Sequence, residues 1–271
     1  RLKPPGGCGA RTTEGSEYEG MDYNELAKVG AELGSLLIQY GAEIYRAEES
    51  MVRLFAAYGA QESQVFALTT CINVTVFKPG GEPVTRISRV QIRTFDLDKI
   101  DRLNDLCRRA CAQYIPLWRL ERALKHIEMG KVFSRPLQAV GLAGVAFAFA
   151  LFFGGGLEEA AVSGLTGLAI FAIQELLNPF RPNLFFSTLL QSLCIGVLCI
   201  GGSYFFPGFQ RDIAIIGAVM NLVPGIAITS FIRDLLSGDY LSGALRFMES
   251  MIVAGAIALG VGIVLFLTQL F

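Results

Sequence analysis

The chain has little of what metal or disulfide chemistry requires. Its 271 residues include one histidine, His126, and six cysteines, and no two cysteines form a CxxC pair. Structural zinc sites need four cysteine or histidine ligands in tetrahedral geometry, and disulfide frameworks belong to small secreted domains that are dense in cysteine. The sequence therefore predicts no metal site and no cofactor, and its cysteines are expected to be free thiols in a reducing compartment.

Motifs of common enzymes are also missing. The sequence has no glycine-rich phosphate loop, no GxSxG turn, and nothing that places Cys71 beside His126 as a catalytic pair. The formal net charge of -1 favours neither nucleic acid nor an acidic partner. A signal peptide is not expected, because the first residues are charged and rich in proline and glycine. These absences argue against an enzyme and against a nucleic-acid-binding protein.

Basic residues are scarce in the second half of the chain. Of the 23 lysines and arginines, four follow Arg135, namely Arg181, Arg211, Arg233 and Arg246. The hydrophobic share is 52% and the mean hydropathy is +0.48, whereas soluble domains are less apolar and about a quarter charged. The sequence therefore predicts a charged N-terminal half that is fused to an apolar C-terminal half.

The N-terminal half predicts a flexible tail over residues 1–20 and a cytoplasmic α+β domain with a β-hairpin over residues 21–133. Helical spacing of apolar residues, alternation and turn residues predict its elements. In chain order they are a helix from the cap at Asp22 to about Phe55, strands over 65–77 and 84–95 joined by residues 78–82, a helix from Asp98 to about Tyr114, and a helix from Pro116 to about Met129.

Two groups of charged residues in this domain are candidates for a function. Glu43 and Arg46 lie one helical turn apart, a spacing that is typical of a solvated ion pair. Arg89 and Arg93 share one face of the second strand, with Arg86 close by. This arginine group could hold an anion, contact lipid headgroups, or protect a strand edge by its charge.

Five apolar runs fill the C-terminal half, residues 134–271. They cover residues 136–153, 157–177, 184–206, 213–232 and 250–271, and each has about the 17–25 residues that a membrane helix needs. The fold class predicted is a membrane protein with a bundle of five transmembrane helices. If the N-terminal half is cytoplasmic, almost all basic residues lie inside. We therefore expect a multi-pass plasma-membrane protein with a cytoplasmic N-terminus and an outside C-terminus.

The fourth run contains the sequence's clearest candidate for a transport site. Asn221 and the pair Pro224-Gly225 interrupt it well inside the predicted span. Polar groups at membrane depth usually face the bundle interior, and broken or kinked helices build many transporter sites. A kink with Asn221 only bonding two helices together is an equal alternative. Glu175 and Gln191 are further pathway candidates, although Glu175 could be an interfacial residue near Arg181.

Polar residues after the fourth run suggest a gate or a coupling site on the cytoplasmic side. Arg233 and Asp234 end the run, and Asp239 and Glu249 lie before the fifth. Residues 235–247 are expected to form a short amphipathic or re-entrant segment.

Several motifs together resemble one known family. They are Gly41-Ala-Glu-Ile-Tyr-Arg-Ala-Glu-Glu49, Thr85-Arg-Ile-Ser-Arg89, Asp96-Leu-Asp98 with Asn104, and Gly217-Ala-Val-Met-Asn-Leu-Val-Pro-Gly225 continuing through Asp239. From Tyr23 to Phe271 the chain resembles the threonine/serine exporter family, in particular the N-terminal-type subunit that also occurs in two-subunit dicarboxylate exporters. The resemblance implies a secondary transporter that exports small amino acids or small carboxylates, driven by the proton motive force.

The resemblance also bears on partners. Full-length members carry about twice as many spans, so we expect a second membrane subunit with a similar number of spans, or self-association. Small residues in the fifth run offer a surface for either. Two other functions stay open from the sequence: a membrane-anchored hydrolase with catalysis in the N-terminal domain, which lacks a recognisable nucleophile and base, and a non-transporting regulatory subunit.

Overall fold

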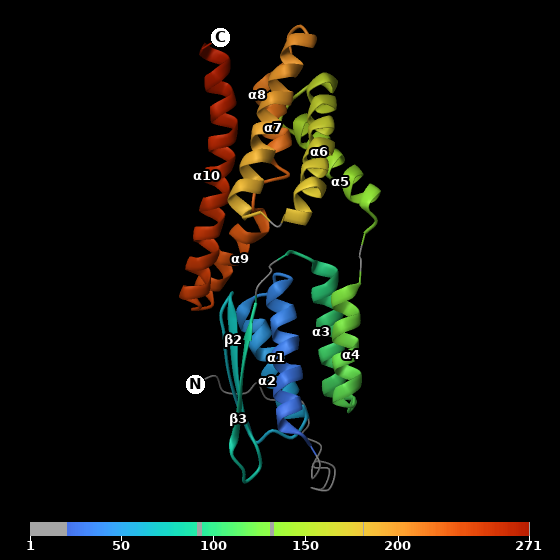
Figure 1. Cartoon of the computed structure of the whole chain (residues 1–271), viewed down its shortest axis with the longest axis vertical. Coiled ribbons are helices and arrows are strands. Elements are labelled where there is room, and N and C mark those ends of the chain that lie inside the picture. The colour runs from blue at the N-terminus through green and yellow to red at the C-terminus, as the bar shows by residue number, and fades with distance from the viewer. Residues whose placement is uncertain (1–20, 91–93, 131–132, 181, 271) are drawn as a thin grey trace. The chain divides into compact units, whose positions relative to one another are not determined.

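The computed structural model describes residues 21–90, 94–130, 133–180 and 182–270, and the predicted tail over residues 1–20 lies outside these ranges. The chain divides into two compact units, residues 1–130 and residues 131–271 (Figure 1). We call them the N-terminal unit and the C-terminal unit and describe each by itself.

Helices and a small sheet make up the N-terminal unit. Its elements are α1 (Tyr23–Gln39), α2 (Ile44–Ala57), β1 (Glu62–Ala67), β2 (Cys71–Phe77), β3 (Pro83–Arg89), α3 (Leu97–Ala112) and α4 (Leu117–Met129). The three strands form an antiparallel sheet in the order β1-β2-β3. The hairpin predicted around residues 78–82 is present between β2 and β3.

Three boundaries in this unit differ from the sequence-based prediction. The first helix is two helices, because Gly41 adopts a left-handed φ of 96° that ends α1 and turns the chain. The segment 65–77 is two strands, since a tight turn joins them through a 2.8 Å hydrogen bond from Leu68 N to Cys71 O. The cap of α3 is Asp96, not Asp98, and its side chain accepts from Lys99 N at 3.0 Å.

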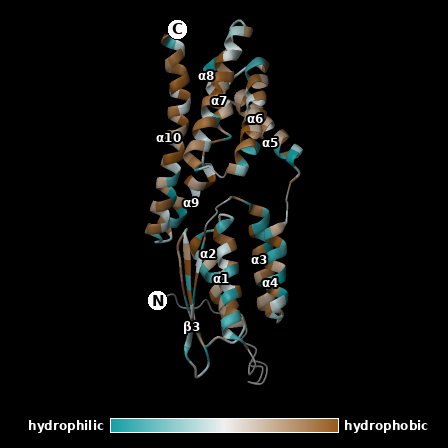
Figure 2. Ribbon diagram, viewed as in Figure 1, coloured by the Kyte–Doolittle hydropathy of each residue, from teal (hydrophilic) through white to brown (hydrophobic). Residues whose placement is uncertain are grey.

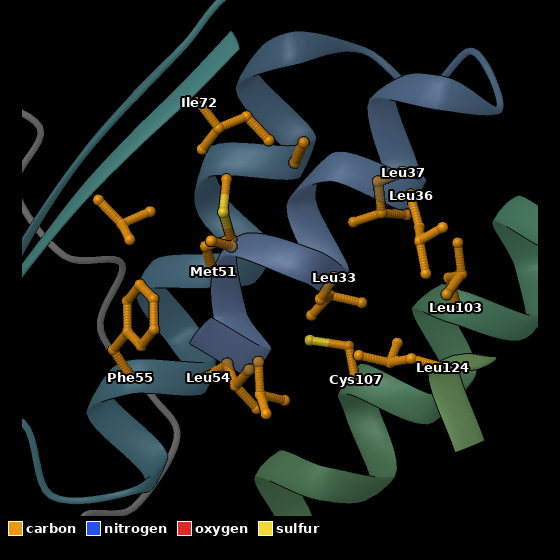
Figure 3. Close-up of a cluster of buried hydrophobic side chains, with 14 of the residues drawn as sticks. Leu33, Leu36, Leu37, Met51, Leu54, Phe55, Ile72, Leu103, Cys107 and Leu124 are labelled. Atoms are coloured by element: carbon orange, nitrogen blue, oxygen red, sulfur yellow. The ribbon is translucent and has the colours of Figure 1, made fainter. Parts of the chain in front are cut away.

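Apolar side chains from the helices and from β2 form the core of the N-terminal unit (Figure 3). Figure 3 labels, among others, Leu33 and Leu37 of α1, Met51 and Phe55 of α2, Ile72 of β2, Leu103 and Cys107 of α3, and Leu124 of α4. Burial of a large apolar side chain contributes about 1.5–3 kcal/mol. This core is therefore the main source of the unit's stability.

All the secondary-structure elements among the described residues of the C-terminal unit are helices or helical turns. Its elements are α5 (Arg135–Phe152), α6 (Leu157–Leu177), a 3-10 turn η1 (Asn178–Phe180), α7 (Leu184–Phe205), α8 (Arg211–Val219), α9 (Gly225–Leu236) and α10 (Tyr240–Leu270). Among the described residues, α5, α6 with η1, α7 and α10 are long and apolar enough to cross a membrane. Figure 2 shows the hydrophobic residues that cover these helices.

Two predictions for the C-terminal unit are wrong in detail. The fourth predicted span is not one helix, because α8 ends at Val219 and α9 begins at Gly225. Neither piece is long enough to cross a bilayer, which takes about 20 helical residues. The segment predicted as amphipathic or re-entrant, residues 235–247, instead contains the end of α9, a turn at Gly238 with φ 89°, and the first turns of α10.

Contacts between helices fix their relative directions. Along α7 and α10, Gly260 lies against Ser192, and a Cβ added at Gly196 would meet Val264 at 2.9 Å. The residue numbers rise together, so α7 and α10 run parallel. On α6 and α7, Gln174 contacts Gln191 and Thr166 contacts Cys199, so these two helices run antiparallel.

Candidate functional site

The interruption between α8 and α9 is the centre of the candidate site. Residues 220–224 belong to neither helix, although Met220 N and Val223 N still donate to carbonyls of α8, and Pro224 stands before the first turn of α9. Proline has no N–H to donate and disfavours helical backbone in the residue before it. Gly225 N instead donates to Val223 O at 2.8 Å, in a tight turn. The sequence places this non-helical stretch within an apolar run, where water cannot satisfy the backbone groups of a lipid-exposed segment.

Close packing holds α8 against α5. A Cβ added to Gly217 would meet the Ala150 backbone at 2.8 Å, so only glycine permits this approach. One turn later, Asn221 Nδ2 donates to Leu142 O at 3.0 Å. The Asn221 side chain thus connects the start of the interruption to the neighbouring helix α5. This contact is the one expected if Asn221 only bonds two helices together.

A buried ion pair joins α9 to α10. Asp234 Oδ2 lies 3.0 Å from Arg246 Nε, and the two side chains are 0% and 5% exposed. The contact is an ion pair without hydrogen-bond geometry, because neither oxygen of Asp234 accepts a hydrogen bond from any described residue. Ionised side chains are costly to bury unless they are paired, and those within membrane bundles mark functional sites more often than chance.

Aromatic and small residues also pack α9 against α10. The rings of Phe231 and Phe247, one on each helix, pack edge to face with centroids 5.2 Å apart. Gly243 allows the close approach of the two helices, because a Cβ there would meet Leu235 at 2.8 Å. The pair therefore lies in a tight seam between α9 and α10.

The predicted pathway residue Gln191 belongs to a short polar row on α6 and α7. Its Nε2 donates to Ser187 Oγ at 2.9 Å, and its Oε1 accepts from Gln174 Nε2 at 3.4 Å. Gln191 itself is buried. Among the described residues, no side-chain hydrogen bond connects this row to Asn221.

The predicted pathway residue Glu175 lies elsewhere. Its Oε2 is 3.2 Å from Arg135 NH1, at the first residue of α5, and its side chain is 33% exposed. This position near two helix ends favours the interfacial alternative. The partner differs from the one considered from sequence, since Arg181 lies outside the described residues.

The remaining cytoplasmic-gate candidates surround the turn between α9 and α10. Arg233 is exposed next to Asp234, while Asp239 and Glu249 are half-buried. The backbone of Asp239 caps the turn, because its N–H donates to Asp234 O and its carbonyl accepts from Gly243 N, each at 2.9 Å. Asp239 therefore shapes the hairpin that brings Asp234 to Arg246.

The candidates of the N-terminal unit fall into two places. Glu43 and Arg46 form an ion pair with Oε2 and Nε 2.7 Å apart, but Glu43 is buried, so the pair is not the fully solvated one that was expected. Arg89 is exposed at the end of β3 opposite Cys71. Arg93 lies outside the described residues, so the arginine group predicted on one face is not seen complete.

Arg86 contributes to a cavity of about 250 Å³ between α1, β3 and the end of α4. Two basic residues, Lys28 and Arg86, and two acidic residues, Glu32 and Glu128, are among its lining residues. Burial raises the pKa of Glu32, and the nearby Glu121 carboxylate raises it further. The lining contains two basic and two acidic residues, and their charges cancel. The cavity therefore has no net preference for an anion.

Sequence reasoning missed the role of Arg246, which it treated only as a loop charge. Opposite charges stand on the two sides of the turn residues Ser237-Gly238-Asp239, but Asp234 lies four residues before Gly238 and Arg246 eight residues after it. Because these distances from the turn differ, the sequence alone does not predict that the two charges meet. Residues 235–247 are too few to show separate helical periodicities for the end of α9 and the start of α10.

Four helices among the described residues are long and apolar enough to cross a membrane, and they place the chain in the class of multi-pass α-helical membrane proteins. Comparison with known sequences identifies the family. Residues 28–268 match the ThrE family of threonine/serine exporters, and the chain belongs to this family.

One curated relative gives the same indication at lower similarity. The "Threonine/serine exporter" of Corynebacterium glutamicum is 23% identical over 265 residues, which cover 92% of this chain and 53% of the relative. The chain thus spans about half the length of the curated relative that it matches. No solved structure matches the chain.

Proposed function

We propose that this chain is a membrane subunit that exports threonine, serine or a related small metabolite. Family membership supports a membrane exporter, and one structural observation carries the proposal to a site. The interruption at residues 220–224 lies between α8, packed into the bundle, and α9, which carries a buried charge. Discontinuous helices with polar groups at membrane depth are how many secondary transporters bind substrate.

The directions of the helices favour five crossings. Because α7 and α10 run parallel and each is long enough to span, the chain between them has to return across the membrane. The interrupted pair α8–α9 is the only part of that connection with enough length, residues 211–236. The predicted fourth span is therefore proposed as a crossing made in two helical pieces.

Charge sets the proposed orientation. Arg135, Arg233 and Arg246 fall on the same side as the N-terminal unit, which holds most of the lysines and arginines, if the chain crosses five times, and the positive-inside rule then places that side in the cytoplasm. A phosphatase reporter fused after residue 271 is expected to be active outside the cell. Activity from a cytoplasmic reporter at that point, with a silent phosphatase, contradicts this topology.

The proposed energy source is the proton motive force, and Asp234 is a candidate for the coupling group. Carboxylates inside membrane bundles commonly take part in proton relays. Imposing an inward proton gradient is expected to accelerate efflux, and a protonophore is expected to slow it. Efflux that is unchanged by both treatments excludes this coupling.

A partner chain is also part of the proposal. The small residues of α10 divide into two sets: Ala256 and Gly260 are buried, the latter against α7, while Gly255, Ala258 and Gly262 are exposed. Small residues at such spacing allow close helix packing in membranes. We propose that this exposed set contacts a second membrane subunit or another copy of the chain.

Export from intact cells tests the proposed function. Cells loaded with a threonine- or serine-containing dipeptide release the free amino acid inside, and the chain is expected to increase its appearance in the medium above an empty-vector control. The assay includes cells that also produce the membrane protein encoded by the adjacent gene, which we call the neighbouring membrane chain, and cells that do not. No increase in either case, with the protein present in the membrane, contradicts the exporter proposal.

A further inference from the structure

The ion pair between Asp234 and Arg246 poses a question that packing does not answer. Taking two charges out of water costs several kcal/mol for each ion, and a buried pair is weak evidence for stability by itself. An apolar pair of similar size would hold α9 to α10 as well or better. A retained charge pair inside an apolar seam therefore points to a role for the charges themselves.

The pair lies where an exported substrate would enter. The 31 residues of α10 rise about 46 Å, whereas the hydrocarbon core is about 30 Å thick. Its most apolar residues follow Ser250, so Arg246 lies near the end of the helix that the proposed topology places at the cytoplasmic side. Asp234 lies on α9, the helix that follows the interruption.

The two residues of the ion pair also lie on different helices, and each helix has its own packing partners. Asp234 belongs to α9, whose main helical contact is α10, and Arg246 belongs to α10, which also packs along α7. A shift of α9 at residues 220–224 would part the two charges without disturbing the α7–α10 contact. Asp234 would then lose the guanidinium of Arg246, and Arg246 would lose the carboxylate of Asp234.

Only some ligands could supply both partners. A zwitterion brings an ammonium group for Asp234 and a carboxylate for Arg246, so no buried charge is left unpaired. A dicarboxylate has no cation for Asp234, and a simple amine has no anion for Arg246. An unpaired buried charge is strongly destabilising, so the pair selects for zwitterions.

We propose that Asp234 and Arg246 determine substrate specificity by exchanging their mutual ion pair for the ammonium and carboxylate groups of an α-amino acid. This inference rests on the proposed export function and deepens it, because it favours amino acids over the dicarboxylates that the sequence resemblance left open. The free Oδ1 of Asp234 is an acceptor for a further N–H of the ammonium group.

Threonine and analogues that differ from it in charge test, on the purified full chain, whether the ligand's charged groups replace the Asp234–Arg246 ion pair. The probes are threonine, threonine amide as a cation, N-acetylthreonine as an anion, and succinate as a dianion, and the readout is the ligand-dependent rise in Tm. For the wild-type chain, threonine is expected to bind at least about tenfold more tightly than the other three. Equal responses to threonine and either single-charge analogue overturn the proposal.

Single variants give a signature that a structural role would not produce. Arg246→Gln leaves the carboxylate of Asp234 unpaired, so the preference is expected to invert toward threonine amide. Asp234→Asn is expected to invert it toward N-acetylthreonine. The neutral double variant Asp234→Asn with Arg246→Gln is expected to lose the response to threonine. An unchanged order of preference in the single variants overturns the proposal.

A matched control pair lies elsewhere in the same unit. Arg211 and Asp212 form an ion pair at 3.7 Å with exposed side chains, and Arg211→Gln with Asp212→Asn makes the same chemical changes. This double variant is expected to keep the wild-type order of preference. If the Asp234 and Arg246 variants do not fold, the binding of the four ligands to the wild-type chain still tests the proposal, because equal responses to threonine and a single-charge analogue overturn it.

The outcome separates the inference from the proposed function. Efflux of threonine from dipeptide-loaded cells without any charge selectivity in binding overturns the inference and leaves the export function standing. Charge-selective binding without efflux contradicts the export function and leaves the recognition site standing.

Discussion

Replacement of Asn221 by leucine tests whether the interruption between α8 and α9 belongs to a transport pathway. The change removes the 3.0 Å hydrogen bond from Asn221 Nδ2 to Leu142 O. Interhelical bonds in membrane proteins contribute about 0.6 kcal/mol on average and about 1.7 kcal/mol at most. Domain stabilities are about 5–15 kcal/mol, so the variant is expected to fold and to reach the membrane at normal levels.

The expected effect of Asn221→Leu on transport is much larger than its effect on stability. Without its tie to α5, the non-helical backbone at residues 220–224 loses its fixed position, and threonine efflux is expected to fall to background. Efflux from dipeptide-loaded cells measures this, with immunoblots of the membrane fraction for protein level. Asn178→Leu makes the same chemical change at an exposed position and is the control. Full efflux from Asn221→Leu would show that Asn221 only bonds two helices together.

Two further predictions concern helix packing and charge. Gly260→Val is expected to lower the stability of the full chain in detergent by about 1–3 kcal/mol, because its Cβ would clash with α7. Gly262→Val is expected to have little effect, since no described atom lies within 4 Å of its added Cβ; equal loss of Tm in both contradicts the described α7–α10 contact. Hydrogen bonds from Lys125 and Lys28 lower the pKa of Glu121 to about 2. The stability that this carboxylate contributes is therefore present above its ordinary pKa near 4.5 and is lost as the pH falls toward 2. Glu121→Gln is expected to weaken the loss of Tm on acidification. The control Glu82→Gln, at the exposed glutamate of the β2–β3 turn, is expected to leave that loss unchanged. Identical dependence of Tm on pH in the wild type and both variants would refute the role given to Glu121.

Local patterns in the sequence predicted much of the fold. The long apolar runs became α5, α6 and α7 with small changes of boundary, and the last run became most of α10, because length and hydropathy largely decide such helices. The turn at Lys78-Pro-Gly-Gly-Glu82 likewise predicted the β2–β3 hairpin. Turn residues and apolar spacing act over a few neighbours, so one sequence is enough to recognise them.

Tertiary contacts decided the parts that the sequence did not predict. A kink was expected at Pro224-Gly225, yet α8 ends five residues before Pro224. Asn221 bonds sideways to Leu142, which is 79 residues away in the chain, and no local pattern contains that partner. The early start of α10 has the same cause, because Asp234 neutralises Arg246 and allows a charged residue inside a buried helix face.

The site candidates divide in the same way. Asn221, Pro224 and Gly225 were found from the sequence because a polar residue and a helix breaker are conspicuous in an apolar run. Arg246 was not found, because its importance depends on a partner across a helical hairpin. Glu175 looked equally conspicuous, but the structure pairs it with Arg135 near the helix ends.

Outward flux of threonine from proteoliposomes tests the central claim most directly, since no other cellular protein takes part. The purified chain is reconstituted alone and together with the neighbouring membrane chain, and vesicles are loaded with labelled threonine. Export by this chain predicts faster release than from protein-free vesicles in at least one of the two preparations, and release at the background rate from Asn221→Leu. Background release from both wild-type preparations, with the protein folded in the vesicles, would contradict the claim.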